Sequence, residues 1–463
     1  MKDKTCAVIL AAGDGTRMKS EYPKVMCEVL FKPMISWVTD NTLEAGINNA
    51  CVVIREKEKR ITPLLPAGFS TAEQGMDKSA GYGTGYAVKM AAQYIKNGEF
   101  SDVVVLFGDA PFISGDDITA SFNQHKAENN VLTVLTANIQ NPDRFGRIVR
   151  DNGKLSSIVE YKDADEETRK ITEINSGAMW FKADFLLEAL ENLNPNNAQG
   201  EYYLTDTVEY AVKSGRPAGA CIVSSEAVLG ANDRKGLAEL NKIALQKVLD
   251  KHMDNGVNIP FADGIVIGAD VEIGADTTIL PGTIIKEKTT IGKNCEIGPN
   301  SNITDAVIKD DCNIISTYID SSVIEDNVKI GPMCNIRPNC HIMQGAKIGD
   351  FVEIKNAVIG EKTAVAHLTY VGDSDVGAGC NFGCGVVTVN YDGTNKHRTV
   401  IGDNAFIGCN TNLVAPVKMG SRSYSAAGTT VTGDVPEGAL VVGRVKQVIK
   451  EGWAEKTGRF SKK

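Results

Sequence analysis

The sequence lacks long apolar runs and paired cysteines. No stretch reaches the roughly 18 apolar residues that a membrane-spanning helix needs, and the apolar run near the N-terminus is broken at once by Gly13 and Asp14, unlike a secretory signal. The eleven cysteines include no C-x-x-C pair, and no cluster of them joins the five histidines at zinc-ligand spacing. We therefore expect a cytoplasmic protein with no membrane segment and with reduced, mostly buried thiols.

An excess of positive charge is also missing. The chain has 49 Lys and Arg against 58 Asp and Glu, a formal net charge of -9. This balance argues against nucleic acid as a partner but allows a local basic pocket for a small phosphorylated substrate. With 463 residues, 43% hydrophobic and 23% charged, the composition is that of a globular protein of two or three domains.

Short apolar segments alternate with amphipathic ones from residue 7 to about residue 222. Strands are expected at residues 7–10, 50–54, 103–107, 131–136 and 178–181, a pattern typical of an α/β sheet with crossover helices. After Asp233, Leu237, Leu240, Ala244 and Val248 share one face of a helix that ends near Gly256. We expect an α/β domain over residues 1–232 and a linking helix over 233–256.

Beyond this helix an aliphatic residue recurs every six positions. This spacing fits neither a helix nor a simple alternation, but it suits a parallel β-helix in which each short face supplies one inward aliphatic side chain. We expect a β-helix over residues 257–445 and a basic tail over 446–463. The three registers are Ile267, Ile273, Ile279, Ile285, Ile291, Ile297 and Ile303; Ile324, Ile330, Ile336, Ile342, Ile348 and Ile354; and Ile401, Ile407, Leu413, Met419 and Val431.

The six-residue repeat is interrupted twice, near residues 314–322 and over residues 367–399. In a solenoid, such register breaks are expected to map to projecting loops. The second interruption is polar and rich in glycine, and it begins at His367. We therefore expect it to supply much of a C-terminal reaction site.

A glycine-rich loop, LAAGDGTRM at residues 10–18, follows the first expected strand. Glycines after a strand let backbone N–H groups approach phosphate oxygens. Such a loop often only reverses the chain, but Arg17 and, after Tyr22-Pro23, Lys24 add two cations that could neutralise a triphosphate. The combination favours a nucleotide site.

The motif LAAGDGTRM followed by YPKVM resembles the signature loop of the sugar-nucleotide pyrophosphorylases. With the β-helix, the further matches make nearly the whole chain similar to the bifunctional N-acetylglucosamine-1-phosphate uridylyltransferase/glucosamine-1-phosphate N-acetyltransferase family. Those matches are VVLFGDAP at 104–111, FGRI at 145–148, IVEYKDA at 158–164, EINSG at 173–177 and GEYYLTD at 200–206.

This resemblance implies a Rossmann-like nucleotidyltransferase domain followed by a left-handed parallel β-helix. The implied reactions are acetyl transfer from acetyl-CoA to glucosamine 1-phosphate and then uridylyl transfer from UTP to N-acetylglucosamine 1-phosphate, with release of pyrophosphate. The product, UDP-N-acetylglucosamine, would serve peptidoglycan and lipopolysaccharide synthesis. The resemblance also implies a homotrimer in which neighbouring β-helices share the acetyl-transfer site.

In the N-terminal domain the resemblance makes Arg17 and Lys24 catalytic, and it makes Asp109 and Asn232 ligands of Mg²⁺, an ion that prefers oxygen donors. From local sequence alone, Asp109 could instead cap a helix or a turn before Pro111, and Asn232 could cap the helix that starts nearby. The residues implied to bind UTP are Leu10, Ala11, Ala12, Gly13, Gly15, Lys24, Gly83 and Thr84.

Gly146, Glu160 and Asn175 are implied to bind N-acetylglucosamine 1-phosphate, although Glu160 could instead be a solvated charge at a strand end. One segment departs from the family, because the usual Gln-Leu-Gly-Thr-Gly-His-Ala, which reads uracil, is matched here by GYGTGYA at residues 81–87. With Gly81 in place of the glutamine, Gln74 or backbone groups are left to read the base.

His367 lies in the segment AVAHLTY at residues 364–370, where the repeat gives way. A lone histidine is often a surface or core residue, but a base of near-neutral pKa can take the proton of an amine that attacks a thioester. The resemblance makes His367 this base. It also assigns glucosamine 1-phosphate binding to Arg337, Lys355, Tyr370, Asn381 and Lys396, of which Arg337 and Lys355 could otherwise be plain exposed charges.

The acetyl-CoA site is implied to be lined by Cys384, Asn390, Tyr391, Cys409, Ala427 and Arg444. Cys384 and Cys409 stand where the family generally has small alanine and serine. Loss of one serine hydrogen bond costs about 1 kcal/mol, so we expect catalysis to survive, with neither cysteine acting as a nucleophile. The basic tail after Arg444 is either solvated or in contact with coenzyme phosphates.

Two other functions are compatible with parts of this pattern. The chain could be a sugar-1-phosphate nucleotidyltransferase alone, with the β-helix as an oligomerisation or regulatory module, but His367 in HLTY speaks against this. It could also be a non-catalytic regulatory scaffold, but the joint presence of Arg17, Lys24 and Asp109 speaks against that, since a decayed site should lose its charges.

Overall fold

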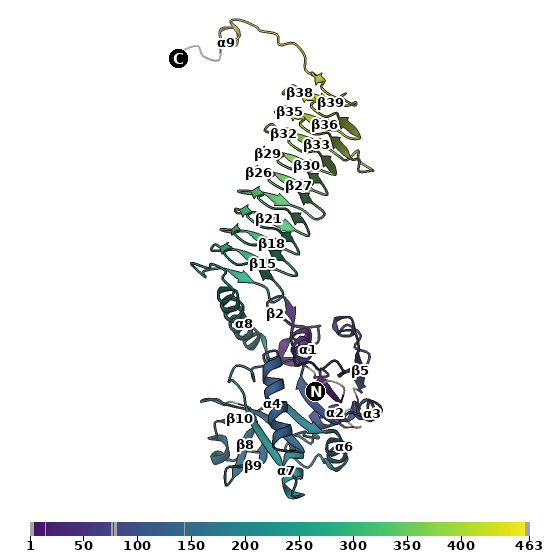
Figure 1. Cartoon of the computed structure of the whole chain (residues 1–463), viewed down its shortest axis with the longest axis vertical. Helices are drawn as coiled ribbons and strands as arrows, with labels where there is room; N and C mark the ends of the chain where they lie inside the picture. The colour runs from purple at the N-terminus through teal and green to yellow at the C-terminus, as the bar shows by residue number, and fades with distance from the viewer. Residues whose placement is uncertain (1–3, 14, 76, 78–80, 143, 459–463) are drawn as a thin grey trace. The chain divides into compact units, whose positions relative to one another are not determined.

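The computed structural model describes residues 4–13, 15–75, 77, 81–142 and 144–458 (Figure 1). The chain divides into two compact units, Met1–Ala244 and Leu245–Lys463, and the division falls inside the long helix α8 (Arg234–Asp254). Among the described residues, no helix is both long enough and apolar enough to cross a membrane.

A nine-stranded sheet forms the centre of the first unit, with the order β11-β7-β10-β6-β1-β4-β5 along its main path and with β8 and β9 beside β10. Strand β10 runs antiparallel to its neighbours β6 and β7, whereas the other pairs of the main path are parallel. The strands are β1 (Thr5–Leu10), β4 (Ala50–Arg55), β5 (Phe69–Gln74), β6 (Asp102–Phe107), β7 (Leu132–Asn138), β8 (Arg147–Asp151), β9 (Lys154–Val159), β10 (Glu173–Lys182) and β11 (Ala218–Ile222). A separate short hairpin joins β2 (Glu28–Val29) to β3 (Lys32–Pro33).

Helices cover both faces of this sheet, as expected for an α/β fold. Because successive side chains of a strand point to opposite faces, Ala7 and Ile9 of β1 pack with α1 and α4, whereas Cys6 and Val8 pack with α2, α3, α6 and α7. Burial on both faces explains the continuous apolar run of β1. The helices are α1 (Met34–Glu44), α2 (Thr84–Met90), α3 (Ala92–Asn97), α4 (Gly115–Ala127), α5 (Glu166–Arg169), α6 (Ala183–Asn192) and α7 (Asp206–Lys213).

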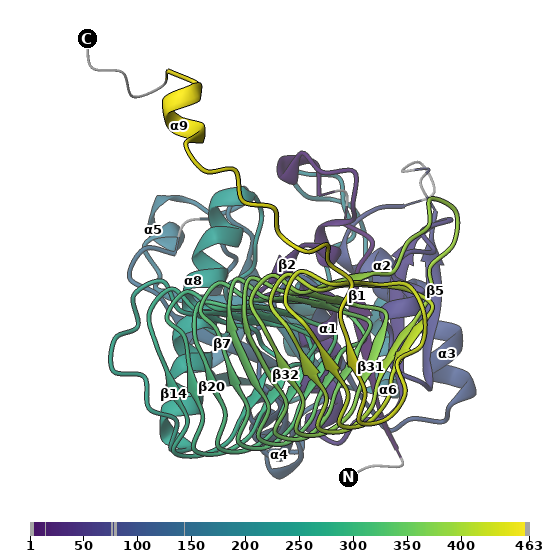
Figure 2. The ribbon, with the colours of Figure 1, turned by 90° about the horizontal axis from the view of Figure 1, so that it is seen from above.

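The second unit is a left-handed parallel β-helix with three faces, as expected from the six-residue repeat. From β12 to β36, each strand pairs in parallel with the strand three places later in the chain, so each coil adds one rung to each of three sheets; at the C-terminal end β38 pairs with β40. Figure 2 shows the successive coils lying one behind another, with the segment that carries α9 (Trp453–Lys456) leaving the last coil.

The three faces have the following strands. The first face holds β12 (Val266–Ile267), β15 (Ile284–Lys286), β18 (Asn302–Thr304), β21 (Tyr318–Asp320), β24 (Asn335–Ile336), β27 (Glu353–Lys355), β30 (Tyr370–Gly372), β33 (Val387–Val389), β36 (Asn412–Val414) and β39 (Thr430–Val431). The second holds β13 (Glu272–Ile273), β16 (Thr290–Ile291), β19 (Val307–Ile308), β22 (Val323–Ile324), β25 (His341–Ile342), β28 (Val358–Ile359), β31 (Ser374–Val376), β34 (Thr399–Ile401) and β37 (Val417–Met419). The third holds β14 (Thr278–Ile279), β17 (Glu296–Ile297), β20 (Asn313–Ile314), β23 (Lys329–Ile330), β26 (Lys347–Asp350), β29 (Ala364–His367), β32 (Asn381–Phe382), β35 (Phe406–Ile407), β38 (Tyr424–Ser425) and β40 (Leu440–Val441).

The interior of the β-helix is a stack of aliphatic side chains in register. On the first face Ile303 pairs with Ile319, Ile319 with Ile336 and Ile336 with Ile354, and each of these side chains is at most 1% exposed. The corners between faces turn through residues with positive φ, many of them asparagine, such as Asn339 and Asn356. Asparagine tolerates this left-handed conformation better than most residues, so it suits the corners.

The expected loop near residues 314–322 is absent from the structure. Ile314, Ile319 and Ile324 all point into the stack, and the steps between them are five residues instead of six. The strands that carry them keep their parallel partners. The interruption is therefore two corners shortened by one residue, and the prediction of a projecting loop there is wrong.

The expected interruption over residues 367–399 is mostly continuous β-helix. Strands β30 to β33 continue all three faces through this stretch, with Val371, Val376 and Phe382 buried at 4% exposure or less. Only residues 390–398, between β33 and β34, leave the coil. Gly377, Gly379, Gly383 and Gly385 lie between strands of the continuing coils, so the prediction of an interruption holds for residues 390–398 alone.

Replacing Ile336 by alanine should destabilise the β-helix. The side chain is 0% exposed and contacts the coils before and after it, and deletions of this kind cost about 2–5 kcal/mol. Denaturant unfolding followed by circular dichroism would measure the change. Asn335→Ala, one residue earlier and exposed, is the matched control and should change the free energy of unfolding by less than about 0.5 kcal/mol. Equal effects of the two substitutions would contradict the inward stacking.

Candidate active sites

The first site lies where parallel strands of the α/β sheet end together. Strands β1, β5 and β6 run in the same direction, so the residues that follow their carboxyl ends meet at one edge of the sheet, where open α/β sheets bind ligands. The glycine-rich loop follows β1, Asp109 follows β6 by two residues, and Gln74 is the last residue of β5. Sequence segments far apart in the chain are thereby brought to one place.

A cluster of opposite charges forms at this edge. The Lys24 ammonium contacts the Asp109 carboxylate and donates a hydrogen bond of 2.8 Å to Asn232 Oδ1. Arg17 Nη2 donates to the same Asn232 oxygen at 3.2 Å. All four predicted residues therefore lie together, although they are up to 215 positions apart.

This cluster lines a cavity of about 470 Å³. The cavity takes in most of the residues expected to bind UTP, whereas Ala11 lies beneath it, 5% exposed, with its N–H bonded to Val53 O at 2.8 Å. The lining residues are Leu10, Ala12, Gly13, Gly15, Arg17, Lys24, Val25, Gln74, Tyr82, Gly83, Thr84, Ala87, Phe107, Asp109, Glu201 and Asn232.

Two glycines allow the chain segments that line this cavity to approach one another closely. Gly15 has a φ of +57°, and a Cβ there would lie 2.9 Å from Lys24 Cβ. Gly83 has a φ of +112°, and its Cβ would lie 2.6 Å from the Tyr202 carbonyl oxygen. Side chains at either position would be strained and would push apart the segments that hold Lys24 and Thr84.

The local alternatives for Asp109 and Asn232 do not hold. Helix α8 is capped by Asp233, whose Oδ1 accepts from the N–H groups of Lys235 at 3.0 Å and Gly236 at 2.9 Å. Helix α4, which follows Pro111, is capped by Ser114 in a capping box with Asp117. The Asp109 and Asn232 side chains therefore serve the cluster and not a helix end.

Gln74, and not Gly81, lines the cavity beside the glycine-rich loop. The Gln74 side chain is 6% exposed. A Cβ at Gly81, where φ is +135°, would lie 2.4 Å from the Tyr86 ring, so a larger residue would not fit there with this backbone. Of the two residues, Gln74 alone brings a side-chain amide to this cavity.

The residues expected to bind the sugar phosphate form a second group. Asn175 N donates to Gly146 O at 2.9 Å, and a Cβ on Gly146 would lie 3.5 Å from both Glu160 carboxylate oxygens. Thr205 Oγ1 donates to Glu160 Oε1 at 3.2 Å. Burial raises the pKa of Glu160 despite this bond, so Glu160 is not a solvated strand-end charge.

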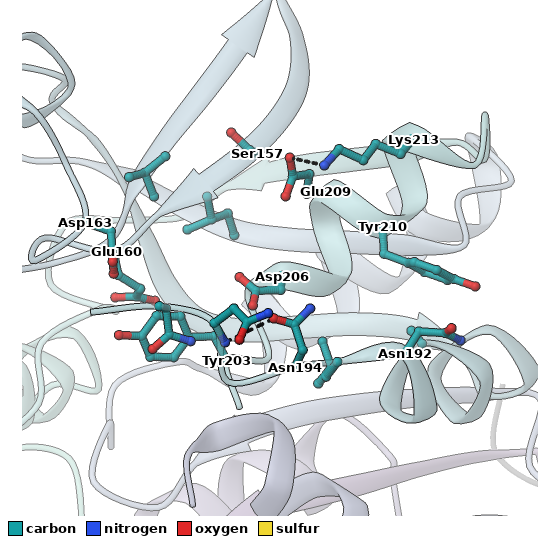
Figure 3. A pocket seen from close by; sticks show the side chains of 16 residues that line it. Ser157, Glu160, Asp163, Asn192, Asn194, Tyr203, Asp206, Glu209, Tyr210 and Lys213 are labelled. Carbon is teal, nitrogen blue, oxygen red and sulfur yellow. Dashed lines mark hydrogen bonds and ion pairs between the residues drawn. The ribbon is translucent and has the colours of Figure 1, made fainter. Parts of the chain in front are cut away.

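Glu160 also lines a second cavity, of about 450 Å³, between β9, α6 and α7. Figure 3 shows the carboxylates of Asp163, Asp206 and Glu209 around it, with Lys213 paired to Glu209 at 2.7 Å. Burial, helped by Glu209 and Asp163, raises the pKa of Asp206 to about 6. Among the described residues, no group of three or more Asp, Glu, His or Cys side chains is arranged to hold a metal ion.

In the β-helix, His367 stands in a column of residues at one corner, which we call the histidine corner: Asp350, His367, Cys384, Cys409 and Ala427. Backbone hydrogen bonds link successive coils beside this column. Gly385 N donates to His367 O at 3.3 Å, and Asn410 N donates to Cys384 O at 2.8 Å. Asp350 Oδ2 lies 3.5 Å from His367 Nδ1, and the histidine side chain is 58% exposed. Arg444 joins the same corner by donating to Ala427 O at 2.5 Å.

The cations expected to bind the sugar phosphate stand at the other edge of the first face, which we call the lysine corner. Arg337 and Lys355 follow Ile336 and Ile354, which pair in register, and Lys355 pairs with Gly372. The neighbouring ammonium of Lys396, with burial, lowers the pKa of Lys355, so Lys355 is not a plain exposed charge. Tyr370 points the same way, since a Cβ on Gly372 would lie 2.3 Å from its hydroxyl oxygen.

Asp373 holds the lysine corner together. Its side chain is 7% exposed, lies 4.0 Å from Lys355 Nζ, and accepts from Asn356 Nδ2 at 2.6 Å and from Asn390 Nδ2. Burial alone would raise its pKa, but these hydrogen bonds outweigh that effect and lower the pKa. The loop 390–398, with Tyr391 and Lys396, is thereby tied to the lysine corner and not to the histidine corner.

Three carboxylates that no sequence motif indicates contact predicted site residues: Asp350 beside His367, Glu353 paired to Arg337 at 3.0 Å, and Asp373. Each contacts a residue 16 to 18 positions away, which is one coil of the β-helix. Counting one coil in either direction from each expected residue would have found them. Asn381 is exposed on the third face, apart from both corners.

Comparison with known proteins gives matches to both units. A nucleotidyl transferase family model matches residues 6–228, and a model described as the GMPPB C-terminal domain matches residues 318–428. The bifunctional protein GlmU of Clostridium botulinum (strain 657) is 44% identical over 461 residues, which cover 99% of both chains. GlmU of Acetivibrio thermocellus is 46% identical, covering 98% of this chain and 97% of that protein.

The chain belongs to the GlmU family. Because these relatives span both units, a nucleotidyltransferase with an inert β-helix and a non-catalytic scaffold are both excluded. The family expected from the motifs is confirmed: the chain is a bifunctional transferase of UDP-N-acetylglucosamine synthesis, with uridylyltransferase and glucosamine-1-phosphate acetyltransferase activities.

Asp206→Asn should alter the pH dependence of stability. The pKa of about 6 in the folded chain lies above the roughly 3.9 of an unfolded aspartate, so the ionised carboxylate destabilises the fold increasingly between pH 4 and pH 6. The free energy of unfolding of the variant, relative to wild type, should therefore rise from pH 4 to pH 7.5. Urea unfolding at both pH values measures this. An equal rise in Asp116→Asn, an exposed carboxylate of α4, would contradict the explanation.

Proposed function

We propose that the cavity at the ends of β1, β5 and β6 transfers the uridylyl group of UTP to N-acetylglucosamine 1-phosphate. The observation that carries this assignment is the convergence of Arg17, Lys24, Asp109 and Asn232 on one cavity beside a glycine-rich loop. A sugar phosphate is already an anionic nucleophile, so the chief needs are charge neutralisation at the α-phosphate and the pyrophosphate and in-line placement of the attacking oxygen. Arg17 and Lys24 meet the first need, and their hydrogen bonds to Asn232 hold both cations at the cavity wall.

Asp109 and Asn232 are suited to hold Mg²⁺. Each offers a side-chain oxygen, and both oxygens contact the one ammonium group of Lys24, so two donors already converge on a positive charge. Mg²⁺ keeps several waters and takes few protein ligands, so two oxygens and the substrate phosphates suffice. When bound, the ion would neutralise phosphate charge.

For the sugar phosphate, the group of Gly146, Glu160 and Asn175 is the proposed binding site. Gly146 leaves open space in front of the Glu160 carboxylate, which Thr205 positions. Asn175 Oδ1 accepts from Gly177 N at 2.9 Å, which leaves the amide N–H₂ group as a donor. A carboxylate and an amide donor of this kind match sugar hydroxyls and an N-acetyl group.

In the β-helix, we propose that His367 takes the proton of the glucosamine amine as it attacks the acetyl thioester. Asp350, 3.5 Å from Nδ1, orients the ring and stabilises the charge that it acquires. Arg337, Lys355 and Lys396 at the opposite edge of the first face bind the sugar phosphate, with Tyr370 and Asn381 as polar contacts to the sugar.

In one chain, the residues proposed to bind acetyl-CoA lie at both edges of the first face. Cys384, Cys409, Ala427 and Arg444 lie at the histidine corner, whereas Asn390 and Tyr391 lie at the lysine corner. Phe351 and Leu368, which directly follow Asp350 and His367, are apolar and each 59% exposed. A homotrimer whose neighbouring β-helices meet at these corners would cover both side chains and complete the site from two chains.

The proposed location is the cytoplasm. All eleven cysteines are free thiols, and disulfides are rare in that compartment. UTP and acetyl-CoA are substrates of cytoplasmic biosynthesis, and the proposed partners are these small molecules with no nucleic acid.

Two substitutions should separate the activities. His367→Ala removes the proposed base, so formation of N-acetylglucosamine 1-phosphate from glucosamine 1-phosphate and acetyl-CoA should fall by at least about 10²-fold. Pyrophosphate release from UTP and supplied N-acetylglucosamine 1-phosphate should be unchanged. Asp109→Ala should give the reverse pattern. Joint loss in either variant, with circular dichroism unchanged, would refute the assignment of one activity to each unit.

Gln74→Ala should weaken the choice of nucleotide base. A buried amide that reads a base edge discriminates against the wrong base by about 1–3 kcal/mol per good bidentate contact, so the ratio of kcat/KM for UTP to that for CTP should fall by about tenfold. Glu73→Ala, at the preceding and exposed position of β5, is the control. An unchanged ratio in Gln74→Ala would assign base selection to backbone groups.

A further inference from the structure

Two of the seven cysteines of the β-helix differ from the other five in accessibility. Cys409 is exposed and Cys384 is half-buried, whereas eight others are buried and only Cys221 shares the intermediate class. Thiolates are the reactive form of cysteine, and burial suppresses them; it raises the pKa of Cys51 to about 11, for example. Reagents from solution should therefore reach Cys384 and Cys409 first in the β-helix.

Cys384 and Cys409 are neighbours on adjacent coils. Phe382 pairs in register with Ile407, and Cys384 and Cys409 each lie two residues after one of these partners, so the two cysteines are also in register. Asn410 N donates to Cys384 O at 2.8 Å. A Cβ on Gly383 would lie 2.9 Å from Cys409 Sγ, so this sulfur leans over the coil that carries Cys384. Adjacent parallel strands lie about 4.8 Å apart, which is within the range of roughly 4.4–6.8 Å that a disulfide spans between Cα atoms.

Both cysteines belong to the histidine corner. His367 occupies the coil before Cys384, and Gly385 N bonds to His367 O. Any covalent change at the pair therefore alters the wall on which the proposed acetyl-transfer site is built. Alanine and serine, expected at these positions in the family, could not undergo it.

We propose that Cys384 and Cys409 form a reversible disulfide that switches off acetyl transfer, and that a small disulfide of the coenzyme A type is the oxidant. This inference rests on the proposed acetyl-transfer site, because a coenzyme A disulfide would reach the pair through the same binding groups as acetyl-CoA. The uridylyl-transfer cavity lies in the other unit and contains neither residue.

The chemistry proceeds by two thiol–disulfide exchanges. The Cys409 thiolate attacks one sulfur of coenzyme A disulfide, forming a mixed disulfide and releasing one coenzyme A thiolate. The Cys384 thiolate then attacks Cys409 Sγ, forming the Cys384–Cys409 bond and releasing the second coenzyme A thiolate. Two protein thiols are oxidised, one disulfide is reduced, and the two protons pass from the protein thiols to the released thiolates.

The test uses the full-length protein, reduced, freed of reductant and then incubated with coenzyme A disulfide. Peptide mass mapping should find a Cys384–Cys409 link. Formation of N-acetylglucosamine 1-phosphate, measured by mass spectrometry, should fall at least about tenfold, since misplacement by about 1 Å can cost up to 10²-fold, and dithiothreitol should restore it. Pyrophosphate release should not change.

Three variants sharpen the result, each compared with its own untreated sample. Cys384→Ala and Cys409→Ser should resist inactivation by the disulfide oxidant, whereas Cys221→Ser should be inactivated like wild type. The chain also holds an internal control, since Cys295 and Cys312 stand on adjacent coils, with Cys312 N donating to Cys295 Sγ at 3.4 Å, but are 2% and 1% exposed. That pair should remain reduced.

Several outcomes would overturn the switch. Acetylation that survives a mapped Cys384–Cys409 link would do so, as would oxidation spread over Cys295 and Cys312, or inactivation that persists in both variants. Failure of the proposed function looks different, because the untreated, reduced protein would then form no N-acetylglucosamine 1-phosphate at all.

Discussion

The C-terminal unit depends on the in-register stacking of one aliphatic side chain per face from coil to coil. Removing these side chains from water drives the coils together, and parallel pairing fixes which residues lie above one another. The same register that aligns Ile336 with Ile354 also aligns the outward residues on either side. An apolar repeat inside the β-helix therefore produces columns of polar residues on its surface, and His367, Arg337 and Lys355 of the proposed acetyl-transfer site are members of two such columns.

The N-terminal unit reaches a similar result by a different route. Its parallel strands end at one edge of the sheet, so loops from distant parts of the sequence meet there. Lys24 lies between two oxygen-bearing side chains, Asp109 and Asn232, which compensate its charge while leaving the cavity wall open. In both units the backbone geometry decides which side chains meet, and the charges then decide what ligand can bind between them.

Much of this architecture could be predicted from the sequence because the core patterns are local. Three of these patterns involve neighbouring positions. They are the strand before the glycine-rich loop, the helix with Leu237, Leu240 and Ala244 on one face, and the six-residue repeat. The motifs also identified Lys24 and Asp109. Their contact spans 85 positions, however, and no local pattern encodes it.

The wrong prediction of a loop near residues 314–322 and the carboxylates that were not predicted have a common physical cause. A corner shortened by one residue moves every later residue out of a strict six-residue count, although the stack itself continues, so the count places Ile319 inside a break. For the same reason the coils around His367, Arg337 and Lys355 span 16 to 18 residues, so the partners of these residues stand at no fixed spacing in the sequence. Packing tolerates this variation because the stacked aliphatic residues keep their parallel partners across the shortened corners.

The β-helix thus separates the length of the chain at the corners from the size of the side chains in the core, two properties that are usually coupled in a folded domain. Inside, side-chain size is restricted by the coils above and below. At the corners, chain length can change by one residue, as between Ile314 and Ile319, or by the nine residues of the loop 390–398, without displacing a single core position. New binding groups can accordingly be added to such a scaffold by lengthening a corner, and evolution can alter what the surface recognises while leaving the folding problem unchanged.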